Sequence, residues 1–201
     1  DRCMKGKPYG DRAVQILSRY LTDFSEEELR ECVSAAYSKE KFGGFAAPLH
    51  LLKKDTDILE LWHGPTSAFK DMALQILPHF LTRAVRKTGE QKKSVILVAT
   101  SGDTGKAAMA GFSDVPDTEV IVFYPHGGVS DAQRLQMTTQ RGNNVHAVAV
   151  EGNFDDAQTG VKKLFPIRIW KRRWQIRDIS SLPPIPSTSD VWYLRLFIMY
   201  T

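Results

Sequence analysis

The stretch His63-Gly-Pro-Thr-Ser-Ala-Phe-Lys-Asp71 places one lysine, Lys70, where a turn leads into a predicted helix. About thirty residues later, Ala99-Thr-Ser-Gly-Asp-Thr-Gly105 forms a glycine-containing loop that leaves a predicted strand and opens another helix. A lysine that forms a Schiff base needs a fixed position, and the aldehyde with which it condenses relieves its charge. An anion can be held by backbone N–H groups at a helix N-terminus. Together, the two stretches indicate a site that combines a reactive amine with an anion-binding loop.

The two motifs, HGPTxAFKD and TSGDTG, resemble those of the threonine synthases. These are pyridoxal-phosphate enzymes of the tryptophan-synthase-β fold type, also called fold type II. The resemblance covers about residues 9–165. It implies an α/β fold with a parallel sheet and helices on both faces, incomplete in this chain, and pyridoxal 5'-phosphate as the cofactor. It also implies the conversion of O-phospho-L-homoserine and water to L-threonine and phosphate.

The resemblance assigns a role to each motif residue. Lys70 is expected to hold the cofactor as a Schiff base and then to move protons at Cα and Cβ of the substrate. Asp103 is expected to face the ring hydroxyl of the cofactor. The substrate carboxylate is expected at the loop, and the substrate phosphate near His63. The residues expected to bind substrate are Thr66, Ser67, Ser101, Gly102 and Thr104.

Each motif also admits an ordinary structural interpretation. A lysine near a helix start is usually a solvated charge, but Lys70 precedes an apolar helix that predicts burial, which is costly for an unpaired amine. The loop could be a plain strand-to-helix turn capped by Thr104. The turn at residues 63–67 could serve only to set the following helix. A nucleotide-binding P-loop lacks its GxxxxGK[ST] spacing here, which argues against that function.

Composition excludes several classes of function. The 201-residue chain carries a net charge of +4, and all of this excess lies after residue 165, where six basic and two acidic residues occur. The first 165 residues are therefore neutral, which argues against nucleic-acid binding. No apolar run long enough for a membrane span occurs. Cys3 and Cys32 match no disulfide or zinc pattern, so we expect reduced thiols and a cytoplasmic protein without a bound metal.

Hydrophobic periodicity predicts helices over residues 11–22, 25–38, 67–87, 104–112, 130–141 and 155–165, and strands over 49–52, 57–62, 94–100, 118–124 and 144–150. Apolar strands that alternate with helices favour a parallel sheet covered on both faces. We expect an N-terminal helical segment at 1–45, a partial pyridoxal-phosphate-binding α/β region at 46–165, and a tail at 166–201. The start at Asp1, without an initiator Met or a signal segment, predicts a fragment.

The tail departs from the preceding pattern, because prolines and tryptophans replace any helical or alternating periodicity. Threonine synthases continue in this region with a segment similar to SSANSINIGRLVPQ. Permitted codons for residues 182–200, read in a shifted frame, can encode SANSINIGRLVPQ. We therefore expect a frameshift near Phe165–Pro166 and a non-native tail. A mixture of basic and aromatic residues in the tail would otherwise suit a single-strand nucleic-acid binder.

The sequence also admits other functions. Within the same fold type, a threonine dehydratase or a cysteine synthase would also eliminate or replace a group at Cβ. The HGPT sequence before the AFKD lysine argues against both enzymes. The chain could also be a non-catalytic fragment. We expect it to be inactive by itself, because the second glycine-rich loop and the partner of the pyridine nitrogen lie further along in the family.

Overall fold

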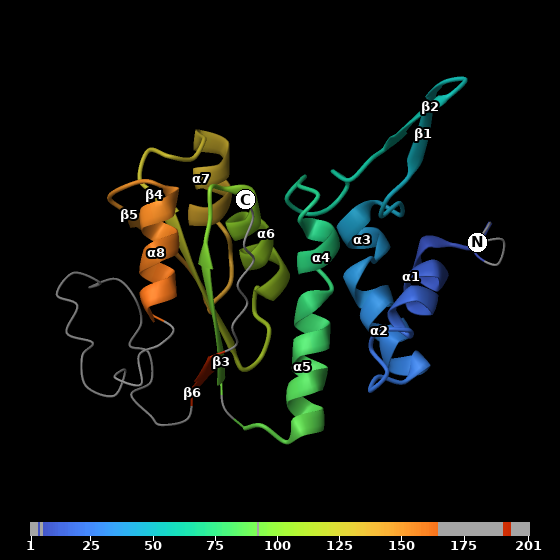
Figure 1. Cartoon of the computed structure of the whole chain (residues 1–201), viewed down its shortest axis with the longest axis horizontal. Coiled ribbons are helices and arrows are strands. Elements are labelled where there is room, and N and C mark those ends of the chain that lie inside the picture. The colour runs from blue at the N-terminus through green and yellow to red at the C-terminus, as the bar shows by residue number, and fades with distance from the viewer. Residues whose placement is uncertain (1–3, 5, 92, 165–190, 194–201) are drawn as a thin grey trace. The chain divides into compact units, whose positions relative to one another are not determined.

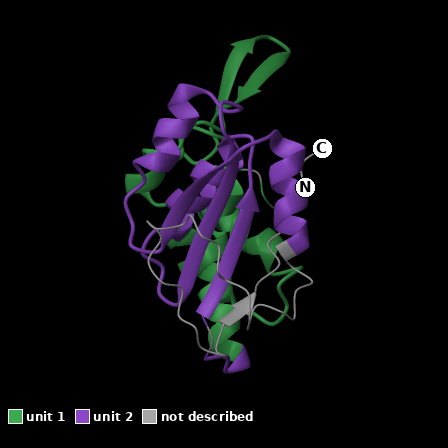
Figure 2. Ribbon diagram, turned by 90° about the vertical axis from the view of Figure 1, so that its left-hand side faces the viewer, with its two compact units in different colours: residues 1–87 green, residues 88–201 purple. Residues whose placement is uncertain are grey.

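The computed structural model describes residues 4, 6–91, 93–164 and 191–193 of the chain. These residues belong to two compact units, residues 1–87 and residues 88–201 (Figure 2). Among the described residues, the first unit contains five helices and a hairpin, and the second contains a parallel sheet with three helices (Figure 1). The predicted frameshifted tail lies mostly outside the described residues, and the predicted boundaries at residues 45 and 165 stay predictions.

The second unit is built on a parallel four-stranded sheet with the strand order β5-β4-β3-β6. Its strands are β3 (Lys93–Ala99), β4 (Thr118–Pro125), β5 (Val145–Val150) and β6 (Val191–Tyr193). The first three match the predicted strands within one residue. The sequence does not predict β6, which pairs with β3 so that Val191 lies opposite Lys93.

Three helices cover both faces of this sheet: α6 (Asp103–Phe112), α7 (Asp131–Thr138) and α8 (Phe154–Leu164). On one face, Val95, Leu97 and Ile121 form a buried cluster with Val161 of α8. The alternate residues, including Val98 and the fully buried Val122, point to the opposite face, on which α6 and α7 pack (Figure 1). The arrangement confirms the predicted parallel sheet with helices on both faces.

The first unit begins with three helices: α1 (Tyr9–Leu17), α2 (Glu26–Ala36) and α3 (Lys39–Phe42). The predicted capping box at the start of α2 is confirmed. The Ser25 hydroxyl accepts the N–H of Glu28, and the Ser25 N–H donates to the Glu28 carboxylate. The predicted helix over residues 11–22 is shorter in the structure, because the chain turns after Leu17.

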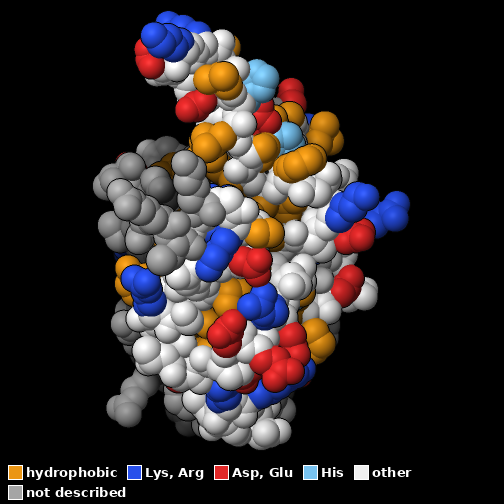
Figure 3. All heavy atoms as spheres, turned by 90° about the vertical axis from the view of Figure 1, so that its right-hand side faces the viewer, with side chains coloured by type: hydrophobic (Ala, Val, Ile, Leu, Met, Phe, Trp, Pro, Cys, Tyr) orange, Lys and Arg blue, Asp and Glu red, His pale blue; other side chains and the backbone are white. Residues whose placement is uncertain are grey.

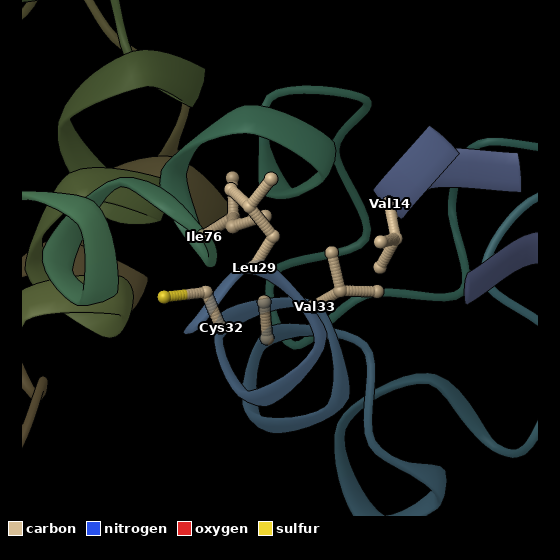
Figure 4. Packing of buried hydrophobic residues seen from close by; sticks show 6 residues of the cluster. Val14, Leu29, Cys32, Val33 and Ile76 are labelled. Atoms are coloured by element: carbon tan, nitrogen blue, oxygen red, sulfur yellow. The ribbon is translucent and has the colours of Figure 1, made fainter. Parts of the chain in front are cut away.

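A small apolar core holds α1 and α2 to the segment after residue 74. Val14, Leu29, Cys32, Val33 and Ile76 pack together with Ala36. Figure 4 shows Leu29 beside Ile76 and Val33 beside Val14. Leu29 and Ala36 are fully buried. Cys32 is a free thiol, and burial raises its pKa; Cys3 lies outside the described residues.

The prediction of one helix over residues 67–87 is wrong. The structure has a four-residue helix, α4 (Asp71–Leu74), and a separate helix, α5 (Leu77–Thr88). Pro78 contributes to the break at residues 75–76, because it has no N–H to donate to the carbonyl of Leu74. The helix also starts later than predicted, because residues 64–70 form turns, with Ser67 at a φ of 56°.

The hairpin formed by β1 (Leu49–Lys53) and β2 (Thr56–Leu59) is antiparallel and forms a sheet of its own. The predicted second strand, 57–62, therefore ends three residues early. The hairpin exposes large apolar side chains, and apolar groups gather in this region of the surface in Figure 3. These exposed residues are Leu49, Leu51, Leu52, Ile58 and Leu59. None of the helices that the structure describes has the length and apolar character of a membrane span.

Candidate active site

The lysine motif of the first unit is organised around a buried carboxylate. Asp71 is fully buried, and it accepts the backbone N–H and the hydroxyl of Thr66, each at 2.8 Å. Gly64 packs directly against the same side chain, since a Cβ at this position would lie 2.5 Å from the Asp71 Cβ. The Ser67 N–H donates to the Gly64 carbonyl at 3.0 Å and closes the turn. The turn before Lys70 is therefore fixed by the residue that follows Lys70.

Lys70 lies at the N-terminal end of α4, with helical backbone angles of −59° and −27°. Its carbonyl accepts the N–H groups of Ala73 and Leu74, which anchors its backbone to the helix. Its side chain is half-buried, and Nζ lies 4.6 Å from the centroid of the Phe69 ring. Leu74 is buried, as the predicted apolar helix requires. The structure therefore presents Lys70 as an amine on a fixed backbone.

The residues expected near the substrate phosphate have different environments. Thr66 is buried, and its hydroxyl is directed at Asp71. Ser67 is exposed, with a left-handed φ of 56° that is rare for a residue other than glycine. His63 contacts the Glu60 carboxylate through Nε2 at 2.6 Å and stacks on Trp62. The turn-setting interpretation accounts for Thr66, and substrate contact by Thr66 and Ser67 stays a prediction.

In the second unit, Thr100 organises the loop between β3 and α6. Its buried hydroxyl accepts the N–H groups of Gly102 and Gly105, each at 2.9 Å. The alternative interpretation of the loop, in which Thr104 caps the helix, is therefore wrong. Gly102 occupies the cap position, and Thr100 supplies the hydroxyl from two residues earlier. A threonine at the end of the strand can reach both N–H groups because the glycine loop folds back over it.

Glycine suits both positions of the loop, through a left-handed φ at Gly102 and through close packing at Gly105. Gly102 has a φ of 136°, and a Cβ there would lie 2.3 Å from the side-chain amide carbon of Gln133. A Cβ at Gly105 would lie 2.6 Å from methyl groups of Thr100 and Val122. Glycine at these two positions lets the loop approach the sheet and α7 more closely than any other residue would.

The predicted substrate residues of the loop lie at the start of α6. Ser101 is exposed, and Thr104 is half-buried. The first i to i−4 hydrogen bond of the helix runs from the Lys106 N–H to the Gly102 carbonyl. The N–H groups of Asp103 and Thr104 precede this bond, so they belong to the turn that favours anions. This geometry suits a carboxylate ligand, and binding of one by Ser101, Gly102 and Thr104 stays a prediction.

Asp103 is held by two side chains that the sequence did not identify as parts of the site. Its Oδ1 accepts from Gln133 Nε2 at 2.9 Å, and it lies 3.2 Å from Nζ of the buried Lys106. Gln133 comes from α7, thirty residues away along the chain. The sequence pattern Ser130-x-x-Gln133 is typical of a capping box, so the cap of α7 could have been predicted from the sequence. The contact between Gln133 and Asp103 could not, because no sequence pattern indicates it.

The structure thus separates the predicted site residues into two sets. Lys70, Thr66 and Ser67 belong to residues 1–87, whereas Ser101, Gly102, Asp103 and Thr104 belong to residues 88–201. Each set is preorganised within its own unit by a buried polar side chain, Asp71 in the first and Thr100 in the second. Within the described part of the chain, no group of three or more His, Cys, Asp or Glu residues is arranged to hold a metal ion.

The chain is similar to threonine synthases over most of its length. It is 41% identical to the threonine synthase of Pseudomonas aeruginosa over 165 residues, which is 80% of this chain and 34% of that protein. It is 38% identical to the threonine synthase of Schizosaccharomyces pombe over 197 residues, which is 94% of this chain and 38% of that protein. The chain thus spans about a third of the length of these relatives. No family model matches it.

A solved structure shows the same similarity. The pyridoxal-phosphate-bound threonine synthase of Brucella melitensis superposes with a TM-score of 0.76 and 36% sequence identity. The superposition covers 84% of this chain and 36% of that chain. At this identity, the shared fold and the shared sequence support each other. Both the lysine motif and the glycine loop lie in the part of the chain that these proteins resemble.

Proposed function

The chain is related to the threonine synthases, and from this relationship we propose that it is part of an enzyme that makes L-threonine. The substrates would be O-phospho-L-homoserine and water, and the products L-threonine and phosphate. The observation that carries the proposal is the pair of preorganised motifs, the Lys70 turn and the loop at residues 100–105, inside a segment about 40% identical to threonine synthases. The cytoplasmic location expected from the sequence remains a prediction.

The donor set in this structure fits pyridoxal 5'-phosphate. Lys70 offers a half-buried amine on an anchored backbone, as a lysine that binds an aldehyde covalently requires. Asp103 offers a carboxylate held in place by Gln133 and Lys106, suited to a ring hydroxyl. When bound, the cofactor would supply an electron sink for the carbanion at the substrate Cα.

The residues of the chain would bind, orient and move protons. Lys70 would hold the cofactor through Nζ, release it to the substrate amine, and then transfer protons at Cα and Cβ. The Ser101 and Thr104 hydroxyls would bind the substrate carboxylate, together with N–H groups in the first turn of α6. The turn at residues 63–67 would contribute to the pocket for the substrate phosphate, which is the leaving group.

A chimeric enzyme tests the proposal without requiring any assumption about the ends of this chain. Residues 9–164 would replace the matching segment of the Pseudomonas aeruginosa relative; we call this protein the chimera. We expect it to restore growth of a threonine-requiring strain that lacks threonine synthase, and to release phosphate from O-phosphohomoserine. The variant Lys70→Ala should do neither.

Two results would contradict the proposal. If the Lys70→Ala variant supported growth as well as the native chimera does, Lys70 would have no role in the mechanism. A folded chimera that binds pyridoxal phosphate but releases a 2-oxo acid from threonine, with no phosphate from O-phosphohomoserine, would indicate the dehydratase alternative. The resemblance of the HGPT motif argues against this second result.

A further inference from the structure

Gln133 uses both ends of its side-chain amide. Its Oε1 accepts the N–H and the hydroxyl of Ser130, at 3.1 and 3.2 Å, and completes the capping box of α7. Its Nε2 donates to Oδ1 of Asp103 at 2.9 Å. The amide therefore links the first turn of α7 to the first turn of α6. Only a side chain with an acceptor and a donor on one planar group makes both contacts at once.

The surroundings leave this amide little freedom to rotate. The Gly102 backbone packs so closely on it that a Cβ would lie 2.3 Å from the amide carbon. On the other side, Asp103 Oδ1 lies 3.2 Å from the Nζ of Lys106, whose side chain is only 9% exposed. Two donors from different helices thus converge on one oxygen of Asp103. Both contacts restrain the orientation of the carboxylate plane.

We propose that Gln133 is a positioning residue that sets the orientation of the Asp103 carboxylate for the cofactor. This inference rests on the proposed function, in which Asp103 faces the ring hydroxyl of pyridoxal phosphate. Gln133 itself is assigned no contact with cofactor or substrate. Its effect passes through Asp103, whose carboxylate must be held as an acceptor at a fixed angle to bind a hydroxyl.

The structure shows which substitution separates positioning from helix capping. In α2 of the same chain, Glu28 occupies the equivalent capping-box position, and its carboxylate accepts the Ser25 N–H at 2.8 Å. Gln133→Glu would therefore keep the cap of α7. The same change replaces the donor that faces Asp103 with a second acceptor, so that two carboxyl groups meet. Ser130→Ala has the converse effect, because it removes the cap hydroxyl and keeps the Nε2 contact.

The pH dependence of the Gln133→Glu variant distinguishes the two roles. When two carboxyl groups meet, one retains its proton to a higher pH than an isolated carboxyl. At about pH 5 the introduced carboxyl can then donate to Asp103, as the amide does, whereas at about pH 8 the two ionised groups repel. Lys106 faces the pair from α6, and Asp131 and Arg134 of α7 pair with each other.

The first measurement follows urea unfolding of the full 201-residue chain at both pH values. We expect Gln133→Glu to lower the urea midpoint, relative to the native chain, distinctly more at pH 8 than at pH 5. Ser130→Ala should lower it by the same amount at both. If Gln133→Glu lowered the urea midpoint equally at both pH values, the proposed contact between residue 133 and Asp103 would be wrong.

The second measurement is the affinity of the chimera for pyridoxal phosphate, followed by absorbance. At pH 8, Gln133→Glu should weaken binding at least about tenfold, with recovery toward the native value at pH 5, while Ser130→Ala binds normally. An equal loss of affinity in both variants would reduce Gln133 to a helix cap. If the native chimera bound no cofactor, the proposed function would fail, whereas the unfolding experiment would still decide the contact between Gln133 and Asp103.

Discussion

Asp71 accepts two hydrogen bonds from Thr66, one from the backbone N–H and one from the hydroxyl, both at 2.8 Å. The two residues enclose the turn that leads into Lys70, and both are buried. A buried carboxylate that accepts two hydrogen bonds contributes more to the free energy of unfolding than an ordinary surface contact does. The geometry of the lysine motif therefore depends on a side chain that the family resemblance does not assign to catalysis.

The first prediction concerns this carboxylate. In Asp71→Asn, the amide oxygen can still accept one hydrogen bond from Thr66, but the amide NH₂ group faces the other Thr66 donor. We therefore expect a loss of about 1.5–3 kcal/mol in the free energy of unfolding. The matched control is Asp57→Asn, because Asp57 is exposed on the hairpin. Urea unfolding of the full chain measures both. Equal effects of the two substitutions would show that the Thr66 contacts carry no stability.

The second prediction concerns the close approach at Gly102. Gly102 and Gly127 both have a left-handed φ, 136° and 71°. A Cβ at Gly102 would meet the Gln133 side chain, whereas a Cβ at Gly127 would have no atom within 4 Å. Both alanine substitutions introduce backbone strain of about 1 kcal/mol or more. We expect the thermal midpoint to fall further for Gly102→Ala, and similar values for the two variants would contradict the close contact between Gly102 and Gln133.

The third prediction concerns pH and His79. Burial, together with the nearby charges of Lys41 and Arg83, lowers the pKa of His79 below 6.5. Between this lowered pKa and 6.5 the unfolded chain binds more protons than the folded chain, so the stability of the fold rises with pH in that window. The pKa of Glu28 is also lowered, by its contact with Lys87, but its effect falls below pH 4.5.

Unfolding between about pH 5.5 and pH 8 therefore leaves out Glu28 and covers the range in which histidines titrate. We expect the native chain to lose stability toward the acid end of this range. His79→Gln should flatten the profile, because the neutral amide does not titrate. The control His126→Gln changes an exposed histidine and should leave the slope unchanged. A slope that persists in the His79 variant would assign the proton uptake to another group.

The fourth prediction concerns the hairpin. Leu51 is 67% exposed, whereas Leu29 is fully buried in the core of the first unit. Leu51→Ala should change the free energy of unfolding by no more than about 0.5 kcal/mol, and Leu29→Ala should cost about 2–5 kcal/mol. Exposed apolar patches promote association, so Leu51→Ala should also lower self-association in light scattering. A large loss of stability for Leu51→Ala would show that the hairpin is covered.

The hydrophobic pattern predicted much of the fold because the central strands are buried on both faces. Val95, Ile96, Leu97 and Val98 form an apolar run that reads as a strand of a parallel sheet. The predicted helix over residues 67–87 was wrong, since its apolar spacing continues through Pro78 while its backbone bonding does not. The short helix α3 and the strand β6 were missed, because pieces of three or four residues show no periodicity.

The candidate site was predicted only in part. The motifs identified Lys70 and the glycine loop, but a list of motif residues does not show which hydroxyl bonds which N–H. Thr100 rather than Thr104 binds the N–H groups of the loop, since the loop folds back onto the end of β3. The contact between Gln133 and Asp103 joins residues thirty positions apart. Such contacts follow from packing of α7 beside α6, which no local pattern specifies.

Chemical trapping can establish whether Lys70 is the amine that holds the cofactor, as we propose. The chimera would be mixed with pyridoxal phosphate, treated with borohydride so that the bond to nitrogen becomes permanent, digested, and analysed by mass spectrometry. We expect the modified group on the peptide that contains Lys70, at about one per chain, with Lys106 unmodified because its side chain is buried beside Asp103. Modification of Lys106 or of scattered surface lysines, with Lys70 intact, would contradict the proposal.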